Sequence, residues 1–261
     1  MNNLLIIPER NQIDKSLELA REEGVGFEYN DFFLPSVLDN EKQVEEMIAF
    51  YKGIEELPSY TTMHGAFLDI TLHSDDPYIV SASDKRVRQS MEIARKLGVK
   101  GIIFHTGLIP GFILPSYLAG FVEKNAAYYR QLCKEYSEIN VYVENMFDDS
   151  PMPLAGLAKA LEDVSNFGVC FDYAHAHIFG KQTSIQDWVE NLAPYVKHIH
   201  INDNDFYNDS HDILGTGKIN WKRFLEYYET FFPKASVLLE VTGYEKAKAS
   251  LAYLKELLND K

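Results

Sequence analysis

The sequence predicts an α/β fold in which a single (β/α)8 TIM barrel takes up the whole chain, residues 1–261. Apolar runs alternate with helical segments eight times, which is the pattern of repeated βα units around a parallel sheet buried on both faces. A closed barrel of ordinary size uses about 250 residues, so the length fits one barrel. No G-x-G-x-x-G follows the first apolar run, which argues against an open dinucleotide-binding sheet.

The predicted elements follow one another at regular intervals. The strands are expected at residues 4–7, 25–30, 60–66, 100–106, 139–145, 168–173, 196–202 and 236–241. The helices are expected to centre on residues 16–23, 41–54, 83–98, 115–136, 154–164, 184–195, 219–232 and 244–258. Boundary signals support three of these helices. They are Asp14 and Gly24 around the first, Ser83 and Gly98 around the third, and Ile219 or Asn220 before Pro233 at the seventh.

Composition and the N-terminus indicate a cytoplasmic protein. Cys133 and Cys170 are too few for a disulfide framework and are expected to be small buried hydrophobic residues. The N-terminal MNNLLIIPERNQ lacks the basic region and the cleavage-site pattern of a signal peptide, and we expect it to contain the first strand. No apolar stretch approaches the roughly 20 residues that span a bilayer, so no membrane partner is expected.

The net charge of −14 argues against a general binder of polyanions, because non-specific affinity for nucleic acid comes from Lys and Arg on phosphates. The exclusion is incomplete, since divalent ions held in an acid-lined pocket reverse the local sign of the charge.

Acids and histidines stand at the carboxyl ends of the predicted strands. In a (β/α)8 barrel these ends meet at one rim, which carries the chemistry. Carboxylate and imidazole groups are the ligands of transition-metal ions. The candidate metal ligands are His64, His105, Glu144, Asp172, His175, His200, Asp209, His211 and Glu240.

Each candidate also has a purely structural interpretation. Glu144 would pair with Lys or Arg at the rim, and His64 or His105 would be hydrogen-bonded core histidines. Taken together, their common place at strand ends favours a metal site. A mixed imidazole and carboxylate set suits Zn²⁺ or Mn²⁺, with Co²⁺ as a substitute, better than an all-oxygen Mg²⁺ or Ca²⁺ cage.

Two neighbouring residues are expected to support the ligands. His198 lies on the same strand face as His200, at the period of two, but deeper, and we expect a hydrogen-bonded core histidine. Glu28 is expected to be the partner of a histidine. Residues 215–217, GTG, either let the backbone approach a substrate or form a tight turn before the seventh helix.

These motifs resemble those of the xylose isomerase-like TIM-barrel superfamily, which includes sugar isomerases and epimerases and the endonuclease IV family. The resemblance runs through HGAFLDI, FHTG, VEN, CFDYAH, HIND, DSHDILGTGKINW and LEVTG and covers nearly the whole chain.

The two branches of the superfamily imply different ligand sets. The isomerase and epimerase branch implies one metal on Glu144, Asp172, His200 and Glu240. The endonuclease IV branch implies three zinc ions on all nine candidate residues. The resemblance therefore implies a divalent metal cofactor, Zn or Mn, with one to three ions.

The resemblance implies an enzyme, and the acidic charge favours an isomerase or epimerase of a sugar, sugar phosphate or polyol ketone, with Glu144 and Glu240 as the catalytic residues. The alternative is a zinc-dependent phosphodiesterase, an AP endonuclease acting on DNA. Undegraded motifs argue against a barrel that serves only for binding. Nucleic acid is a partner only under the alternative, and a homo-oligomer is expected from the resemblance alone.

Aromatic residues in the predicted rim loops could wall a compact sugar pocket. The six candidates are Phe32, Phe33, Phe67, Phe112, Tyr173 and Phe206. We assign substrate contact to Phe67 and to His177, for which metal ligation is the alternative. Phe67 and Leu68 also stand where the endonuclease branch carries a wedge that penetrates DNA, and packing on the barrel rim is their other interpretation.

Overall fold

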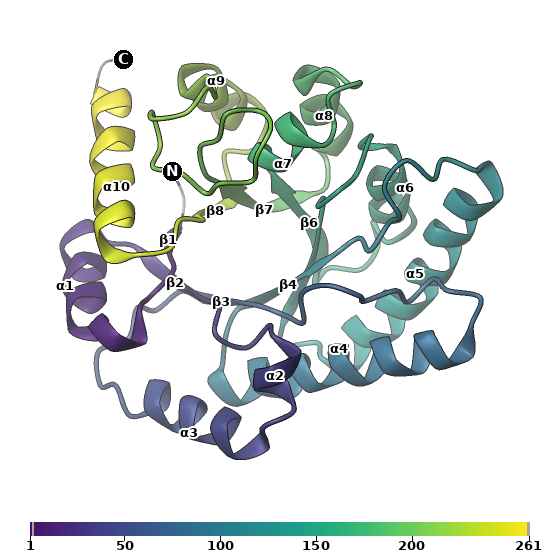
Figure 1. Cartoon of the computed structure of the whole chain (residues 1–261), viewed down its shortest axis with the longest axis horizontal. Coiled ribbons are helices and arrows are strands. Elements are labelled where there is room, and N and C mark those ends of the chain that lie inside the picture. Colours follow the sequence, from purple (N-terminus) through teal and green to yellow (C-terminus); the bar gives the residue numbers. More distant parts are fainter. Residues whose placement is uncertain (2, 260–261) are drawn as a thin grey trace.

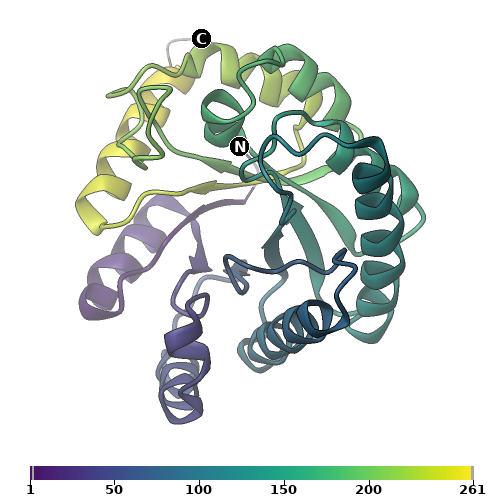
Figure 2. The same cartoon turned by 45° about the vertical axis from the view of Figure 1, so that its right-hand side comes forward.

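The fold is a closed barrel of eight parallel strands, which confirms the predicted (β/α)8 TIM barrel (Figure 1). The structure is a computed structural model that describes residue 1 and residues 3–259. The strands follow one another around the barrel in sequence order, and β1 closes the ring by pairing in parallel with β8. Figures 1 and 2 show the strands around the centre and the long helices outside them.

The strands lie close to the predicted ranges, most of them slightly shorter than expected. They are β1 (Leu4–Ile6), β2 (Gly26–Tyr29), β3 (Thr61–His64), β4 (Gly101–His105), β5 (Asn140–Glu144), β6 (Phe167–Asp172), β7 (Val196–Ile201) and β8 (Ser236–Leu239).

Among the described residues, the helices include all eight that were expected and two more on the rim. The eight are α1 (Ile13–Glu23), α3 (Glu41–Lys52), α4 (Pro77–Leu97), α5 (Pro115–Glu135), α6 (Met152–Ala160), α8 (Ile185–Leu192), α9 (Trp221–Phe231) and α10 (Tyr244–Asn259). The additional ones are the short α2 (Pro35–Leu38) and α7 (Tyr173–Ile178), and a 3₁₀ turn, η1 (Arg10–Gln12), precedes α1.

Two predicted helix starts are wrong. Asp14 does not cap α1, because Gln12 holds the N-cap position and Asp14 lies inside the first turn. The helix expected to begin at Ser83 begins at Pro77, where the Asp76 carboxylate accepts a hydrogen bond from the Tyr78 N–H. An N-cap acid followed by proline is a strong helix start, and it overrides the weaker signal at Ser83.

The predicted helix ends are correct, as is the start of the seventh expected helix. Gly24 and Gly98 end α1 and α4 in the left-handed conformation, at φ 65° and 73°, which glycine adopts without strain. Asn220 caps α9 by accepting from the Arg223 N–H. Cys133 and Cys170 are free and buried, as expected.

Successive residues along each strand face alternately outward, toward the helices, and inward, toward the barrel interior, where the candidate site lies. Outward-facing residues such as Ile102, Phe104, Val141 and Val143 are fully buried against the helices. Inward-facing Ile103, Tyr142 and Cys170 form a separate small cluster inside the barrel. The next inward positions toward the carboxyl ends belong to the histidines and acids, so the barrel interior becomes polar at its upper rim.

Within the described part of the chain, none of the helices combines the length and the apolar character that a membrane-crossing segment needs.

Candidate metal centre

The strand ends bring six of the nine predicted ligands to one buried place above the barrel interior: His64, His105, Glu144, Asp172, His200 and Glu240. The register pairs His105 with Glu144 on neighbouring strands, and Asp172 with His200. Asp172 ends β6 and also caps α7, where its carboxylate accepts from the His175 N–H at 2.6 Å. These side chains are 7% exposed or less, so their polar atoms depend on one another.

The first of three candidate groups joins two strand-end histidines to Glu144. The Nε2 atoms of His64 and His105 lie 3.6 and 3.7 Å from Glu144 Oε2. The Nδ1–H of His64 donates to the Gly65 carbonyl at 3.0 Å, which directs Nε2 toward Glu144. The group therefore offers two imidazole nitrogens and one carboxylate oxygen to a common point.

The second, central group contains Glu144, Asp172, His200 and Glu240, all buried. His200 Nδ1 lies 3.3 Å from Glu144 Oε1 and 3.4 Å from Glu240 Oε2, so the two glutamates flank the same imidazole nitrogen. Glu144 belongs to both this group and the first one, and would bridge ions bound to the two.

The third group contains His175, Asp209 and His211. The two oxygens of Asp209 reach the Nε2 atoms of His175 and His211 at 3.3 and 3.2 Å. The opposite nitrogens donate to backbone carbonyls, His175 Nδ1 to Asn145 and His211 Nδ1 to Glu240. Both imidazoles are thereby held with Nε2 facing the aspartate.

Unpartnered buried atoms test whether these residues fit a metal ion. Both oxygens of Glu144, Asp172 Oδ2, Glu240 Oε2, His175 Nε2 and both nitrogens of His200 make no hydrogen bond of good geometry, although several lie 3.2–3.7 Å from a nitrogen or oxygen of a neighbouring side chain. Buried polar atoms almost always have partners, because an unsatisfied one is costly. Converging carboxylate and imidazole atoms without partners fit one or more divalent cations.

Burial raises the pKa of the central acids, and the neighbouring imidazoles lower it. Burial works against ionisation of Glu144, yet the imidazoles of His200, His64 and His105 together outweigh it and hold the pKa of Glu144 well below its usual value. Burial also opposes ionisation of Glu240, and His200 and His211 together lower its pKa. At Asp172 burial prevails and raises the pKa to about 8. A divalent cation would favour the ionised acids further, so binding should release protons.

A second layer of hydrogen bonds orients the ligands from inside the barrel. Glu28 accepts from Thr62 Oγ1 at 2.7 Å and from His198 Nε2 at 3.0 Å, and its other oxygen lies 3.2 Å from His200 Nε2. Ser236 Oγ is hydrogen-bonded to His198 Nδ1 at 2.6 Å. The expected roles of Glu28, as a histidine partner, and of His198, as a core histidine, agree with this arrangement.

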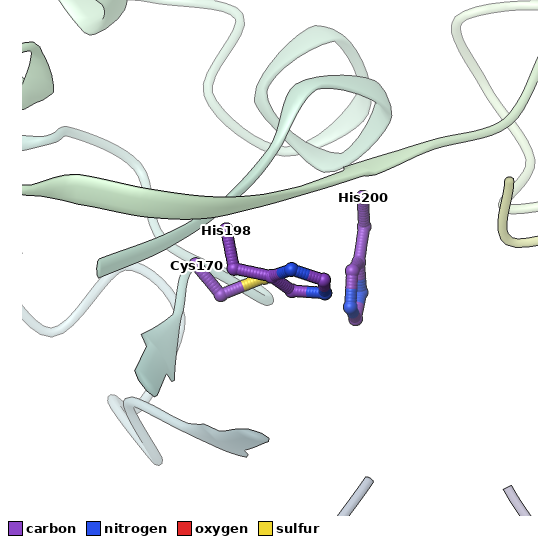
Figure 3. Close-up of side chains that lie close together, drawn as sticks. All are labelled: Cys170, His198 and His200. Carbon is purple, nitrogen blue, oxygen red and sulfur yellow. The ribbon is translucent and has the colours of Figure 1, made fainter. Parts of the chain in front are cut away.

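Cys170, His198 and His200 also approach one another, as Figure 3 shows, but they do not form a metal site. Both nitrogens of His198 are occupied by hydrogen bonds. Burial raises the pKa of the Cys170 thiol well above its usual value, so this side chain is a neutral thiol in the barrel interior.

A cavity of about 980 Å³ opens above the first and second groups, next to His64, His211 and Glu240. Phe33 and Phe67 form one wall, with ring centroids 5.3 Å apart, and Phe67 packs edge-on against His105. Asp31 is fixed in the lining by Arg10, 3.0 Å away, and by the Tyr51 hydroxyl. The lining residues are Ile7, Pro8, Glu9, Arg10, Asn11, Asn30, Asp31, Phe33, His64, Phe67, His211, Glu240 and Thr242.

Four of the six aromatic residues expected to wall this cavity lie elsewhere. Phe32 and Tyr173 are buried in the core between barrel and helices, because Phe32, in the bend after β2, turns inward and Tyr173 begins α7 directly after β6. Phe112 and Phe206 line other cavities. Phe67 lines the main cavity, and His177 does not, because it stacks on Phe206 on another side of α7.

The GTG segment is a tight turn built around Asp203. The Asp203 carboxylate accepts from the Gly215 N–H at 2.8 Å, from the Ile219 N–H at 3.2 Å and from the Trp221 indole N–H at 2.9 Å. A Cβ on Gly217 would lie 2.3 Å from Asp203 Oδ1, so the turn needs glycine there. Asp203 follows β7 as the other rim acids follow their strands, and that position is the signal that could have identified it.

The chain belongs to the xylose isomerase-like TIM-barrel family, because the sequence model of that family matches residues 17–257. It is 25% identical over 204 residues to an uncharacterized protein of Methanocaldococcus jannaschii, covering 75% of this chain and 69% of that one. It is 26% identical over 183 residues to a probable endonuclease 4 of Halorhodospira halophila, covering 62% of this chain and 60% of that one. The match thus spans less than two thirds of that second relative.

Solved structures share the fold over the full chain. The TTHB071 protein of Thermus thermophilus, soaked with ZnCl2, has a TM-score of 0.76 at 24% identity and covers 100% of this chain and 99% of that one. A D-tagatose 3-epimerase-like protein has a TM-score of 0.75 at 21% identity, covering 100% and 98%. Endonuclease IV of Thermus thermophilus has a TM-score of 0.63 at 18% identity, covering 100% and 99%. Family members of known activity are enzymes, and both predicted branches appear among them.

Proposed function

We propose that this protein is a divalent-metal-dependent isomerase or epimerase that acts on a sugar or a related polyol ketone. The observation that carries the proposal is the pair Glu144 and Glu240, which flank His200 Nδ1 beneath an acid-lined, aromatic-walled cavity. A pair of carboxylates on opposite sides of a substrate can take a proton from carbon on one face and return it on the other.

Glu144, Asp172, His200 and Glu240 would hold the ion. That a protein of the same fold was soaked with ZnCl2 is in keeping with a divalent metal. When bound, the ion supplies Lewis-acid polarisation of a substrate carbonyl. Zn²⁺ and Mn²⁺ both suit this ligand set. His175, Asp209 and His211 would orient ligands or substrate at the edge of the centre.

Glu240 is the better placed of the two carboxylates to act as the base. It lines the cavity, whereas Glu144 lies beneath it among the histidines. Its pKa is lowered because His200 and His211 outweigh the effect of burial, so at neutral pH it is ionised and ready to accept a proton.

The rest of the cavity suits an uncharged polyol. Glu9, Asn30 and Asp31 present hydrogen-bonding groups to hydroxyls, and Phe33 and Phe67 present ring surface to the C–H face of a sugar. Arg10 in the lining is already paired with Asp31. A phosphate in this cavity would therefore meet carboxylates rather than free cations.

The second candidate is a zinc-dependent phosphodiesterase, favoured by the three groups of ligand atoms that meet through shared Glu144 and neighbouring side chains. Clustered ions stabilise the attacking and leaving oxygens of phosphoryl transfer. The probable endonuclease 4 among the relatives supports the same candidate. The acidic lining of the cavity argues against a DNA backbone, since binding one depends on free Lys and Arg.

The test combines metal content with two substrate panels. Protein purified without added metal or chelator is analysed for its ions and assayed on ketoses and inososes, and on duplex DNA with an abasic site. We expect sugar turnover that falls by about 1000-fold or more in Glu240→Gln, because that variant loses a carboxylate base. Its metal content should fall only in part, and Glu245→Gln, which removes an exposed acid of α10, should match the wild type.

Wild-type turnover in Glu240→Gln would contradict the assigned role of this residue. Three zinc ions per chain together with cleavage at the abasic site, lost in His64→Ala or His105→Ala, would replace the isomerase proposal by the phosphodiesterase.

A further inference from the structure

A second cavity, of about 450 Å³, lies beside α7, between the segment that leads into α8 and the loop that joins β7 to α9. It is lined by His177, Lys181, Thr183, Tyr207 and Lys218, among others. None of its lining residues contributes to the three groups of candidate metal ligands, and none lines the main cavity.

The lining of this second cavity is cationic in a strongly acidic chain. Lys181 and Lys218 approach the same ring, with Nζ 4.5 and 5.5 Å from the centroid of Tyr207. Asp and Glu are absent from the lining, among the residues that the structure describes. Two ammonium groups gathered on one ring in an acid-free lining create a positive potential that attracts anions.

The nearby acids are engaged in other contacts. Asp187 accepts from Ser184 Oγ at 2.6 Å, and Asp205 accepts from the N–H groups of Tyr207 and Asn208, at 2.8 Å each. These hydrogen bonds hold both carboxylates in local capping and turn motifs. Besides the N–H groups of Tyr207 and Asn208, the charge of Lys218 lies close enough to Asp205 to help lower its pKa, whereas none of the described carboxylates forms an ion pair with Lys181. The positive charge of Lys181 is therefore available to a ligand, and that of Lys218 is shared with Asp205.

Hydrogen-bond donors complement this charge. His177 borders the cavity and its ring is held by stacking on Phe206, 5.1 Å away, while its Nε2 is buried away from the open space. Ile185, at the first position of α8, also lines the cavity, and the first N–H groups of a helix have no intrahelical partner. Donors at a helix start next to two ammonium groups suit a multiply charged oxyanion.

We propose that this cavity binds the phosphate group of a small phosphorylated molecule, held by Lys181, Lys218 and the backbone N–H groups at the start of α8. The cavity exceeds the size of the anion alone, so it has room for part of the organic group. The site is separate from the main cavity, where carboxylates disfavour phosphate.

The same loop links the two sites. Phe206 and Tyr207 line the phosphate cavity, and Asp209 and His211, a few residues further on, belong to the third ligand group. Phe206 and His211 both have positive φ, 69° and 46°, which is costly for these residue types and must be maintained by surrounding contacts. A phosphate on Lys181 and Lys218 would hold this loop in the conformation that presents Asp209. Only this link rests on the proposed metal centre; the binding does not.

The test is a titration of metal-loaded protein with inorganic phosphate, glycerol 3-phosphate and glycerol, followed by amide NMR. We expect both phosphates, but not glycerol, to shift residues 177–185 and 205–218. Lys181→Gln/Lys218→Gln should weaken this binding by about tenfold or more, because it removes both ammonium groups. The matched control Lys52→Gln/Lys85→Gln, which removes two exposed lysines of α3 and α4, should leave it unchanged.

Shifts confined to the residues around His64, Glu144 and Glu240 would overturn the proposal, because the phosphate would then be on the metal centre. Equal affinity in Lys181→Gln/Lys218→Gln would overturn it as well. Tighter binding of glycerol 3-phosphate than of inorganic phosphate would support an organic phosphate as the ligand, and equal or weaker binding would overturn that part of the proposal in favour of the free anion. Glu240→Gln should bind phosphate in this cavity as the wild type does. A failure of the phosphate proposal can therefore be told apart from a failure of the proposed catalysis.

Discussion

At the scale of single residues, Glu144 connects the candidate metal centre. It ends β5 and lies within 3.7 Å of nitrogens from His64, His105, His175 and His200. One carboxylate thus ties four strand-end or rim histidines together. Its position was predictable from the sequence, because an acid at the end of an apolar strand needs a partner at the rim.

Other residues of the site were not predictable in this way. Arg10, in η1 after β1, and Asp31, in the loop after β2, enter the cavity lining only because the closed barrel brings these segments beside Phe33 and Phe67. Their mutual ion pair joins positions far apart in the sequence. Apolar periodicity locates strand ends, but it does not show which loop side chains turn inward.

Asp148 provides a prediction for pH. It is 4% exposed and accepts from Thr106 Oγ1 and the Met146 N–H, and burial raises its pKa to about 7. A raised carboxyl pKa gives stability that is complete below the unfolded value of 3.8 and is lost as the pH rises through 7. In Asp148→Asn, which cannot ionise, the free energy of unfolding relative to that of the wild type should rise with pH between about 4 and 7 and level off above 7. The difference should grow by up to about 1.4 kcal/mol per pH unit.

Urea unfolding at about pH 5, 6, 7 and 8 measures this difference. Asp14→Asn removes an exposed acid from α1 and should show no such growth with pH. A constant offset between Asp148→Asn and the wild type across that range would mean that Asp148 is not the group responsible.

At the scale of elements, the eight strands and the bodies of eight helices were predictable from periodicity, whereas α2 and α7 were not. Both are rim insertions, of 4 and 6 residues, too short to show a helical period. α7 forms where Asp172 caps the chain as it leaves β6, so a candidate metal ligand also starts the helix that carries His175. Local propensity alone does not indicate such a turn.

Two glycines should respond oppositely to substitution by alanine. Gly120 lies within α5, where an added Cβ meets nothing within 4 Å, so Gly120→Ala should stabilise the protein by about 1 kcal/mol. Gly180 packs against buried Trp188, and its Cβ would lie 2.5 Å from the indole nitrogen. Gly180→Ala should therefore destabilise the protein by roughly 1–3 kcal/mol.

Urea unfolding of both variants at one pH tests this pair, and each serves as the other's control. The packing argument for Gly180 fails if the two substitutions shift the midpoint in the same direction.

At the scale of the whole molecule, the sequence predicted the closed barrel and its family correctly, and the same barrel explains why the ligands converge. Residues from His64 to Glu240 meet because parallel strands all end at one rim. The distribution of charge around that rim was not predictable. The acidic main cavity and the cationic second cavity arise from loops that lie apart in the sequence.

Removal of metal should destabilise the entire barrel. Without a cation, the unpartnered oxygens of Glu144, Asp172 and Glu240 stay buried close to one another. Chelation should therefore lower the Tm by about 5–10 °C, since an ion that binds only the folded state stabilises it. Calorimetry of protein before and after EDTA dialysis measures the change, and ZnCl2 or MnCl2 should reverse it.

Glu144→Gln is the matched variant, because it should weaken ion binding and reduce the response to EDTA. The same Tm in wild-type protein with and without its metal would contradict a stabilising ion at this centre.

The turn around Asp203 has a consequence for how such a barrel can change over generations. One carboxylate fastens the return of the β7–α9 loop at Gly215, Ile219 and Trp221, and the Asp203–Asp212 bridge closes its base. The base of this loop is therefore fixed, and residues 205–211 at its tip can be replaced without disturbing the barrel. Insertions or replacements there would add or remove the candidate ligands Asp209 and His211 while the four central candidates stay in place.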